Sequence, residues 1–147
     1  MPRINYRVVP LDKGGAGLPG QTHEWLPFLP VKLSHGKKAT PWFPAFVDSG
    51  SHCCLFDVGL ARTLEIDLTK GVADKIHGLR DEAWIKVRYV KVSMTVAGET
   101  LILPVGFAAI DPLQGLLGRA GFFENFTVLF DHEHDPPGME IDRIVRG

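Results

Sequence analysis

Asp48 is the residue of this sequence that is best placed for acid–base chemistry. It follows an apolar run that ends at Val47, and Ser49, Gly50 and Ser51 come directly after it. The apolar run predicts a buried strand, and Gly50 allows the backbone to turn sharply at the strand end. Since a partly buried carboxylate needs hydrogen bonds, we expect the Ser51 hydroxyl to donate to its outer oxygen, which favours the ionised form. The alternative is an Asx-turn, in which Asp48 only caps its own backbone.

Two other groups of residues carry side chains that bind metals or act as nucleophiles. His132 and His134 stand among acidic residues and have the ligand types of a Zn²⁺ or Ni²⁺ site. No second ligand cluster at a zinc-site spacing accompanies them, so we predict a solvated loop with no metal and no cofactor; a small metal-binding β domain is a further interpretation. Cys53 and Cys54 are adjacent in an apolar run. That position predicts buried, unreactive thiols and disfavours a disulfide between them.

Composition and charge limit the classes of protein to which the chain can belong. Its 147 residues, 45% of them hydrophobic, are enough for one domain with a real core. The net charge of -1 gives no basis for binding nucleic acid or an anionic membrane surface, and no apolar run approaches the roughly 20 residues of a membrane span. The N-terminus lacks the apolar stretch of a signal peptide, and the cysteine usage fits a reducing compartment, so we expect a cytoplasmic protein.

Turn residues and alternating hydrophobicity predict a mainly β chain, organised as one domain over residues 1–147. Strands are predicted at 25–33, 40–47, 53–56, 85–96, 100–105 and 126–130, with a short helix at 58–65 that Asp57 caps. A flap-like hairpin covers 72–90, with Gly78 at its tip. An N-terminal arm, 1–25, and a C-terminal tail, 131–147, contain extended pieces from Ile4 to Val9 and from Met139 to Val145. We expect these end pieces to be unpaired strands that invite pairing with a second chain.

The two halves of the chain follow the same order of elements. In each half, two strands joined by a glycine-containing turn lead to a short motif, which is Asp48-Ser49-Gly50 in the first half and Leu116-Leu117-Gly118-Arg119 in the second. With the hairpin around Gly78, these motifs resemble the retropepsin-like aspartic proteases over about residues 26–130. The resemblance implies an all-β fold, a closed barrel of the acid protease type with one or two short helices. It also implies that Leu116, Leu117 and Gly118 cross behind the Asp48 loop in a ψ-shaped arrangement.

The same resemblance implies an aspartic endopeptidase that works as a homodimer. Each subunit would supply one Asp48, and the two carboxylates would share a proton while they activate a water that hydrolyses a peptide bond. Ser49 would tie the two loops together, Gly50 would leave room for the substrate backbone, and Gly78 would lie in a flap over the groove. The implied partners are a second copy of the chain and a peptide or protein substrate.

A second class of function fits the same motifs, namely a non-catalytic retropepsin-like module that binds peptides in the same dimer groove. The flap-like segment carries the charged residues Arg80, Asp81 and Glu82 beside its only glycine. No acidic residue closely follows Gly50, so we expect Arg119 to lack the carboxylate partner that retroviral members tend to provide. Both features are less typical of an enzyme that cleaves long peptides.

Overall fold

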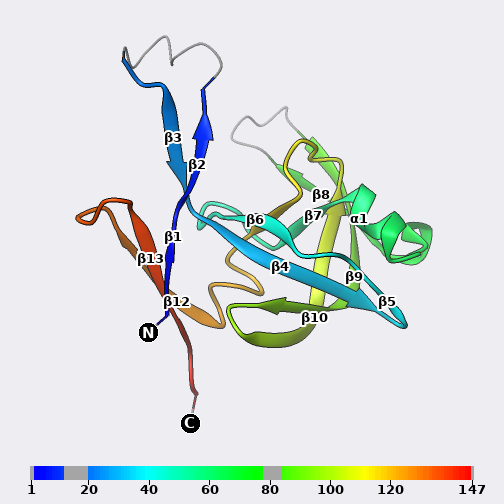
Figure 1. Cartoon of the computed structure of the whole chain (residues 1–147). Coiled ribbons are helices and arrows are strands. Elements are labelled where there is room, and N and C mark those ends of the chain that lie inside the picture. Colours follow the sequence, from blue (N-terminus) through cyan, green and yellow to red (C-terminus); the bar gives the residue numbers. More distant parts are fainter. Residues whose placement is uncertain (1, 12–19, 78–83, 147) are drawn as a thin grey trace. The chain divides into compact units, whose positions relative to one another are not determined.

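The computed structural model describes residues 2–11, 20–77 and 84–146 (Figure 1). Strands make up 57% of it and helices 7%, so the predicted all-β class is confirmed. The helices are α1 (Val58–Thr63) and a short 3₁₀ helix, η1 (Leu68–Lys70). The strands in chain order are β1 (Arg3–Asn5), β2 (Arg7–Pro10), β3 (His23–Leu26), β4 (Phe28–His35), β5 (Lys38–Ala39), β6 (Phe43–Val47), β7 (Leu55–Asp57), β8 (Val72–His77), β9 (Trp84–Val96), β10 (Glu99–Ala108), β11 (Gly115–Leu117), β12 (Phe126–Asp131) and β13 (Gly138–Arg143).

Contacts between residues divide the chain into two compact units. They are called here the barrel unit (residues 29–125) and the terminal unit (residues 1–28 and 126–147). In the barrel unit the strand order is β4-β6-β11-β7-β10-β9, and β9 pairs again with β4, which closes a six-stranded barrel. β5 and β8 are added as outer strands. Along β4, Leu29, Val31 and Leu33 are buried while the residues between them are more exposed, the pattern of a strand with one face on a core. The predicted closed barrel with short helices is therefore confirmed.

Aromatic side chains fill much of the barrel interior. Phe56, Phe107 and Phe122 are almost completely buried. The Phe56 ring meets Phe43 edge to face, with centroids 5.7 Å apart, a favoured aromatic geometry. Gly115 lies against this ring, and a Cβ at that position would lie 2.8 Å from Phe56 Cδ1. The first residue of β11 is thus small because the core beside it is already full.

The predicted helix after the Asp48 loop is present, and Asp57 begins it. Asp57 Oδ2 accepts a hydrogen bond from the Gly59 N–H at 3.0 Å, which satisfies one of the free donors at the helix start. Asp57 Oδ1 accepts from the N–H groups of Ile110 and Asp111 at 3.0 and 3.1 Å. One carboxylate therefore fastens α1 to the loop that follows β10.

The terminal unit pairs the two ends of the chain with each other, which corrects the prediction that they are unpaired. β1 runs antiparallel to β13, with Arg3 opposite Glu140 and Asn5 opposite Gly138. β13 also pairs with β12, so the order of this three-stranded sheet is β1-β13-β12, and β2 and β3 form a separate hairpin. The backbone groups of the ends find partners inside the same chain, where pairing requires no association with a second molecule.

The double role of Asp57 predicts a pH-dependent loss of stability in Asp57→Ala. Burial raises the pKa of this carboxyl, but the three backbone hydrogen bonds and the Arg62 charge together outweigh burial, and the net pKa lies below its ordinary value. A carboxyl with a lowered folded-state pKa stabilises the fold above its unfolded pKa, and that contribution is lost as the pH falls through the folded pKa. We expect the free energy of unfolding to fall by about 1–2 kcal/mol at pH 7 and by progressively less below about pH 4, as measured by urea denaturation.

The matched control is Asp67→Ala, because Asp67 caps η1 through the Thr69 N–H at 3.0 Å and, among the described residues, its carboxylate accepts only from Thr69. It should destabilise the protein less than Asp57→Ala does at pH 7. Equal losses in the two variants would show that the bonds to Ile110 and Asp111 contribute nothing.

Candidate active site

The Asp48 loop lies where one strand is inserted between the two strands that flank the loop. β6 leads into the loop, β7 leads out of it, and β11 lies between them. β11 runs parallel to β6, with Leu116 opposite Phe46 and Leu117 opposite Val47, and antiparallel to β7. The Asp48 N–H donates to the Leu117 carbonyl at 2.9 Å. The structure therefore brings the two sequence motifs together, with the second crossing beneath the first.

Beyond β11 the two motifs approach each other backbone to backbone. The Arg119 N–H donates to the Ser51 carbonyl at 2.9 Å. Gly118 has no room for a side chain, since a Cβ there would lie 2.2 Å from the Cys53 carbonyl oxygen and 2.7 Å from that of Ser51. Only glycine permits so close an approach, which explains its place in the second motif.

The Asp48 side chain is half-buried, and its hydrogen bonding is local. Its Oδ1 accepts from the Gly50 N–H at 2.9 Å, and the Ser51 N–H donates to the Asp48 carbonyl at 3.1 Å. This arrangement is the Asx-turn of the alternative interpretation. It fixes the carboxylate and leaves it able to bind further, because no described residue donates to Oδ2. One oxygen of Asp48 therefore remains for a partner from outside the loop.

Ser51 supports the loop in a different way from the one that we predicted. Its hydroxyl donates to the Cys53 carbonyl at 2.8 Å. A serine has a single O–H to donate, and a carbonyl two residues away lies within reach of a local turn. The Cys53 carbonyl therefore accepts the only hydrogen bond that the Ser51 hydroxyl can donate. The predicted hydrogen bond from Ser51 to the Asp48 carboxylate is therefore not formed, and the hydroxyl stiffens the exit of the loop instead.

Arg119 has a partner in the Asp48 loop, although no acidic residue closely follows Gly50. Its Nη1 donates to the Ser49 carbonyl at 2.8 Å. A guanidinium can be satisfied by a backbone carbonyl as well as by a carboxylate, and a hydrogen bond from a charged donor is stronger than one between neutral groups. The partner of Arg119 is thus a backbone carbonyl and not a carboxylate, and the side chain ties the second motif to the exposed Ser49.

An apolar wall joins the Asp48 loop to the flap-like hairpin. Its buried members are Cys53 and Leu55, which follow the loop, Val87 of β9 and Ala108 of β10. Half-buried apolar side chains complete the wall, namely Ile76, Tyr89, Ile110, Leu116 and Ala120. The sequence alternation in 85–89 predicts a strand with one apolar face, and that face is the one that meets the residues after the loop.

Two thiols lie beside the loop, and both are buried and free. Burial raises the pKa of both, that of Cys54 to about 12, so neither is a thiolate at neutral pH. Cys53 Sγ lies 3.4 Å from the Tyr89 hydroxyl, and burial raises the pKa of that phenol as well. Sequence reasoning missed this neutral pair, because the two residues are far apart in the chain and carry no spacing signal.

The hairpin predicted over 72–90 is present in the described residues. β8 and β9 pair from Val72 opposite Tyr89 to His77 opposite Trp84. The predicted tip residue, Gly78, and the charged residues Arg80 to Glu82 lie outside the described residues.

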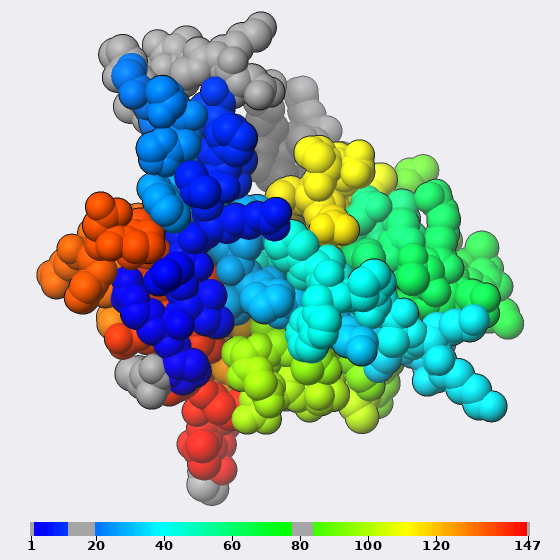
Figure 2. All heavy atoms as spheres, in the orientation of Figure 1, coloured from blue at the N-terminus to red at the C-terminus, as the bar shows by residue number. Residues whose placement is uncertain are grey.

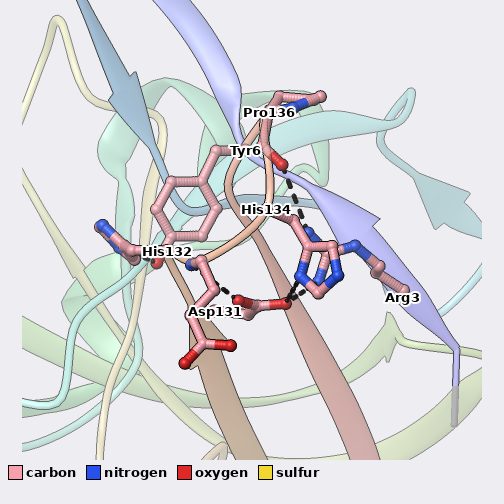
Figure 3. Close-up of polar contacts among 7 residues, drawn as sticks. Arg3, Tyr6, Asp131, His132, His134 and Pro136 are labelled. Carbon is pink, nitrogen blue, oxygen red and sulfur yellow. Dashed lines mark hydrogen bonds and ion pairs between the residues drawn. The ribbon is translucent and has the colours of Figure 1, made fainter.

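The two histidines of the 131–138 loop are held by protein groups in the terminal unit (Figure 3). His134 Nδ1 lies 2.5 Å from Asp131 Oδ2, which also accepts from Arg3 Nη1 at 2.7 Å. His132 Nε2 lies 2.9 Å from the Tyr6 hydroxyl. In the part of the chain that the structure describes, no group of three or more His, Cys, Asp or Glu side chains is placed to hold a metal ion. These contacts favour a structural role, in which the loop fastens β1 to the β12–β13 hairpin.

No protein-family model matches this chain, and no curated protein matches it. Within the described residues, no helix has both the length and the apolar character that a membrane span needs. The interpretation of the site therefore depends on the geometry of the Asp48 loop and its neighbours.

The close crossing predicts that Gly118→Ala is severely destabilising. A Cβ that overlaps the Cys53 carbonyl can be accommodated only if β11 and the loop exit separate, which breaks the bond from Arg119 to Ser51. We expect a loss of at least about 3 kcal/mol in the free energy of unfolding, measured by urea denaturation.

Gly98→Ala is the control for the backbone effect of adding a Cβ. Gly98 has open space around it but a φ of +78°. The free energy of unfolding of the variant should therefore fall only by the roughly 1–2 kcal/mol that a left-handed backbone costs a residue with a Cβ. A Gly118→Ala variant as stable as this control would contradict the crossing.

Proposed function

We propose that this protein is an aspartic-type endopeptidase in which Asp48 supplies one half of a catalytic carboxylate pair. The observation that carries the proposal is the crossing of β11 beneath the loop, with the Asp48 N–H on the Leu117 carbonyl and the Arg119 guanidinium on the Ser49 carbonyl. The crossing holds a half-buried carboxylate rigidly at the end of a barrel strand. Acid–base catalysis requires such fixed placement, because small displacements of the reacting groups lower the rate steeply.

A single carboxylate cannot perform the reaction, so the proposal requires a second copy of the chain. In the pair, one Asp48 is ionised and takes a proton from the attacking water, while the other is protonated and donates toward the carbonyl oxygen of the substrate. Two carboxylates about 3 Å apart cannot both ionise, and they titrate as a unit. The proposed active form is therefore a homodimer whose two-fold axis passes between the Asp48 loops.

The surroundings of the loop favour a peptide or protein substrate with apolar side chains near the cleaved bond. The half-buried members of the apolar wall, Ile76, Ile110 and Leu116 among them, would lose contact with water when such a side chain binds. Both cysteines are free, which favours a reducing compartment such as the cytoplasm.

We further propose that the second copy pairs through β12, an outer strand of the terminal sheet. The Ile141 N–H donates to the Pro2 carbonyl, so Ile141 bonds toward β1. Its neighbour across the ladder, Val128, consequently directs its own N–H and C=O to the free edge, and so does Phe130 two residues on. Between them Leu129 is 55% exposed, and the strand carries no charge before Asp131, so nothing in it discourages edge-to-edge pairing.

This geometry predicts that Leu129→Cys forms a disulfide between two copies. Antiparallel pairing that is symmetric about Leu129 places it opposite Leu129 of the partner subunit at a non-hydrogen-bonded position. There the Cβ atoms lie about 4.5–5.5 Å apart, within reach of a disulfide after a small adjustment. Mild oxidation should convert the variant to a covalent dimer on a non-reducing gel, whereas the native thiols are buried and should not react.

Thr127→Cys is the matched control, since Thr127 lies on the same face of β12 but away from the axis. It should remain uncrosslinked. Cross-linking of Thr127→Cys in place of Leu129→Cys, or a wild type that sediments as a monomer at tens of micromolar, would contradict pairing through β12.

The catalytic role predicts that Asp48→Asn abolishes hydrolysis while the fold and the dimer remain. The amide keeps an oxygen that accepts from the Gly50 N–H but cannot take a proton from water, so we expect a loss of at least about 100-fold. The assay is cleavage of a mixed peptide library across the acidic to neutral range. Asp67→Asn, which alters an exposed cap far along the chain, should retain activity; full activity in Asp48→Asn would end the aspartic assignment.

The alternative function is a peptide-binding module without catalysis. The bond from the Gly50 N–H to Asp48 Oδ1 favours it, because it gives the carboxylate a structural task that needs no reaction. A wild-type dimer that retains library peptides on a column but releases no fragments would support this alternative over the peptidase.

A further inference from the structure

A cavity of about 830 Å³ lies in the barrel unit beside the β8–β9 hairpin. Apolar side chains from other elements line it, namely Val58 of α1, Leu68 of η1 and Phe107 of β10. The hairpin supplies the remaining side, including Lys75, Trp84, Lys86 and Arg88. This volume and this mixture of apolar surface with a few polar groups are typical of small-molecule sites.

The hairpin presents different chemistry on its two faces. The register places Lys75 opposite Lys86 and Ala73 opposite Arg88. Because side chains alternate along a strand, Trp84, Lys86 and Arg88 share the face that lines the cavity. Tyr89 belongs to the opposite face and to the apolar wall. Val87 contributes to both, since it is a buried member of that wall and also lines the cavity.

The cavity side carries an excess of positive charge. Lys75 and Lys86 are directly opposite each other in the ladder, and like charges in that position are destabilising. Among the described residues, neither lysine makes an ion pair. Asp74, the acidic residue of the lining, is engaged with the backbone N–H of Lys75 at 2.7 Å. The repulsion would be relieved by an anion bound between the two ammonium groups.

Trp84 adds an aromatic surface next to these charges. Its side chain is 52% exposed although it lines the cavity, and Lys75 Nζ lies 5.8 Å from the centre of its ring. The His77 ring already lies against Trp84, with ring centroids 3.4 Å apart. The surface of Trp84 that remains exposed would cover a flat ring on one side while the ammonium groups bind an attached acid.

We propose that this cavity binds a small anion with an aromatic body. The acidic group lies between Lys75 and Lys86, and the ring lies against Trp84 and the apolar residues Val58 and Leu68. The inference is independent of the proposed peptidase activity, since it uses no residue of the Asp48 loop and is tested by binding alone.

The test uses the full chain and 8-anilinonaphthalene-1-sulfonate, a fluorescent aromatic sulfonate, as the probe. We expect saturable binding of about one probe per chain, which weakens as salt is added because the attraction is partly electrostatic. The double variant Lys75→Gln with Lys86→Gln should raise the dissociation constant about tenfold or more. It should remain folded, since it removes a repulsion.

Two further variants separate the cavity from general effects of charge and folding. Lys37→Gln removes a lysine from the β4–β5 turn, which projects from the surface at the right of Figure 2 and lies outside the cavity lining; it should leave the affinity unchanged. Ala109→Trp fills the cavity from an exposed position and keeps the lysines, so it should block the probe. Undiminished binding in the lysine double variant or in Ala109→Trp would overturn the proposal, as would an equal loss in Lys37→Gln.

Discussion

The insertion of β11 between β6 and β7 is the constraint on which the rest of the structure depends. β11 is a link in the closed ring of strands, and without it β6 and β7 would have no common neighbour. Its parallel pairing with β6 joins segments that are far apart in the chain, so loop closure opposes it and tight contacts must offset that entropy. The contacts are backbone hydrogen bonds at both ends of β11, and Gly118 allows the chains to approach closely enough to form them. Barrel closure and the placement of Asp48 are thus consequences of one crossing.

Features that depend only on residues close together in the chain could be predicted from the sequence. The period-two alternation in β9 and the cap at Asp57 follow from near neighbours, and both are present in the structure. The association of the two motifs was predictable only through the resemblance, because hydrophobic alternation identifies a strand but does not say which strand lies beside it. The same limit explains the error at the chain ends. Strands were predicted at both ends, but their pairing with each other was not.

The hydrogen-bond partners of individual side chains could not be predicted from the sequence, for a different reason. Backbone carbonyls are present at every residue, so composition carries no signal of where a hydroxyl or a guanidinium will find one. The Ser51 hydroxyl donates to the Cys53 carbonyl, and the Arg119 guanidinium donates to the Ser49 carbonyl. A search for acidic partners misses both bonds, although both reinforce the loop that the sequence had singled out.

The geometry also bears on whether Asp48 is more than a turn residue. An Asx-turn at a strand end needs only the carboxylate and the N–H of Gly50, and it forms in isolated loops without any support from elsewhere. Here the same loop is held from beneath by Leu117 and from the side by Arg119. Those contacts restrain the backbone of the loop but leave one oxygen of Asp48 without a described donor. The same contacts help to close the barrel, and they also give Asp48 the fixed placement that a carboxylate needs when it must meet a second carboxylate and a substrate. For this reason we propose a catalytic role for Asp48 in addition to its role in the turn.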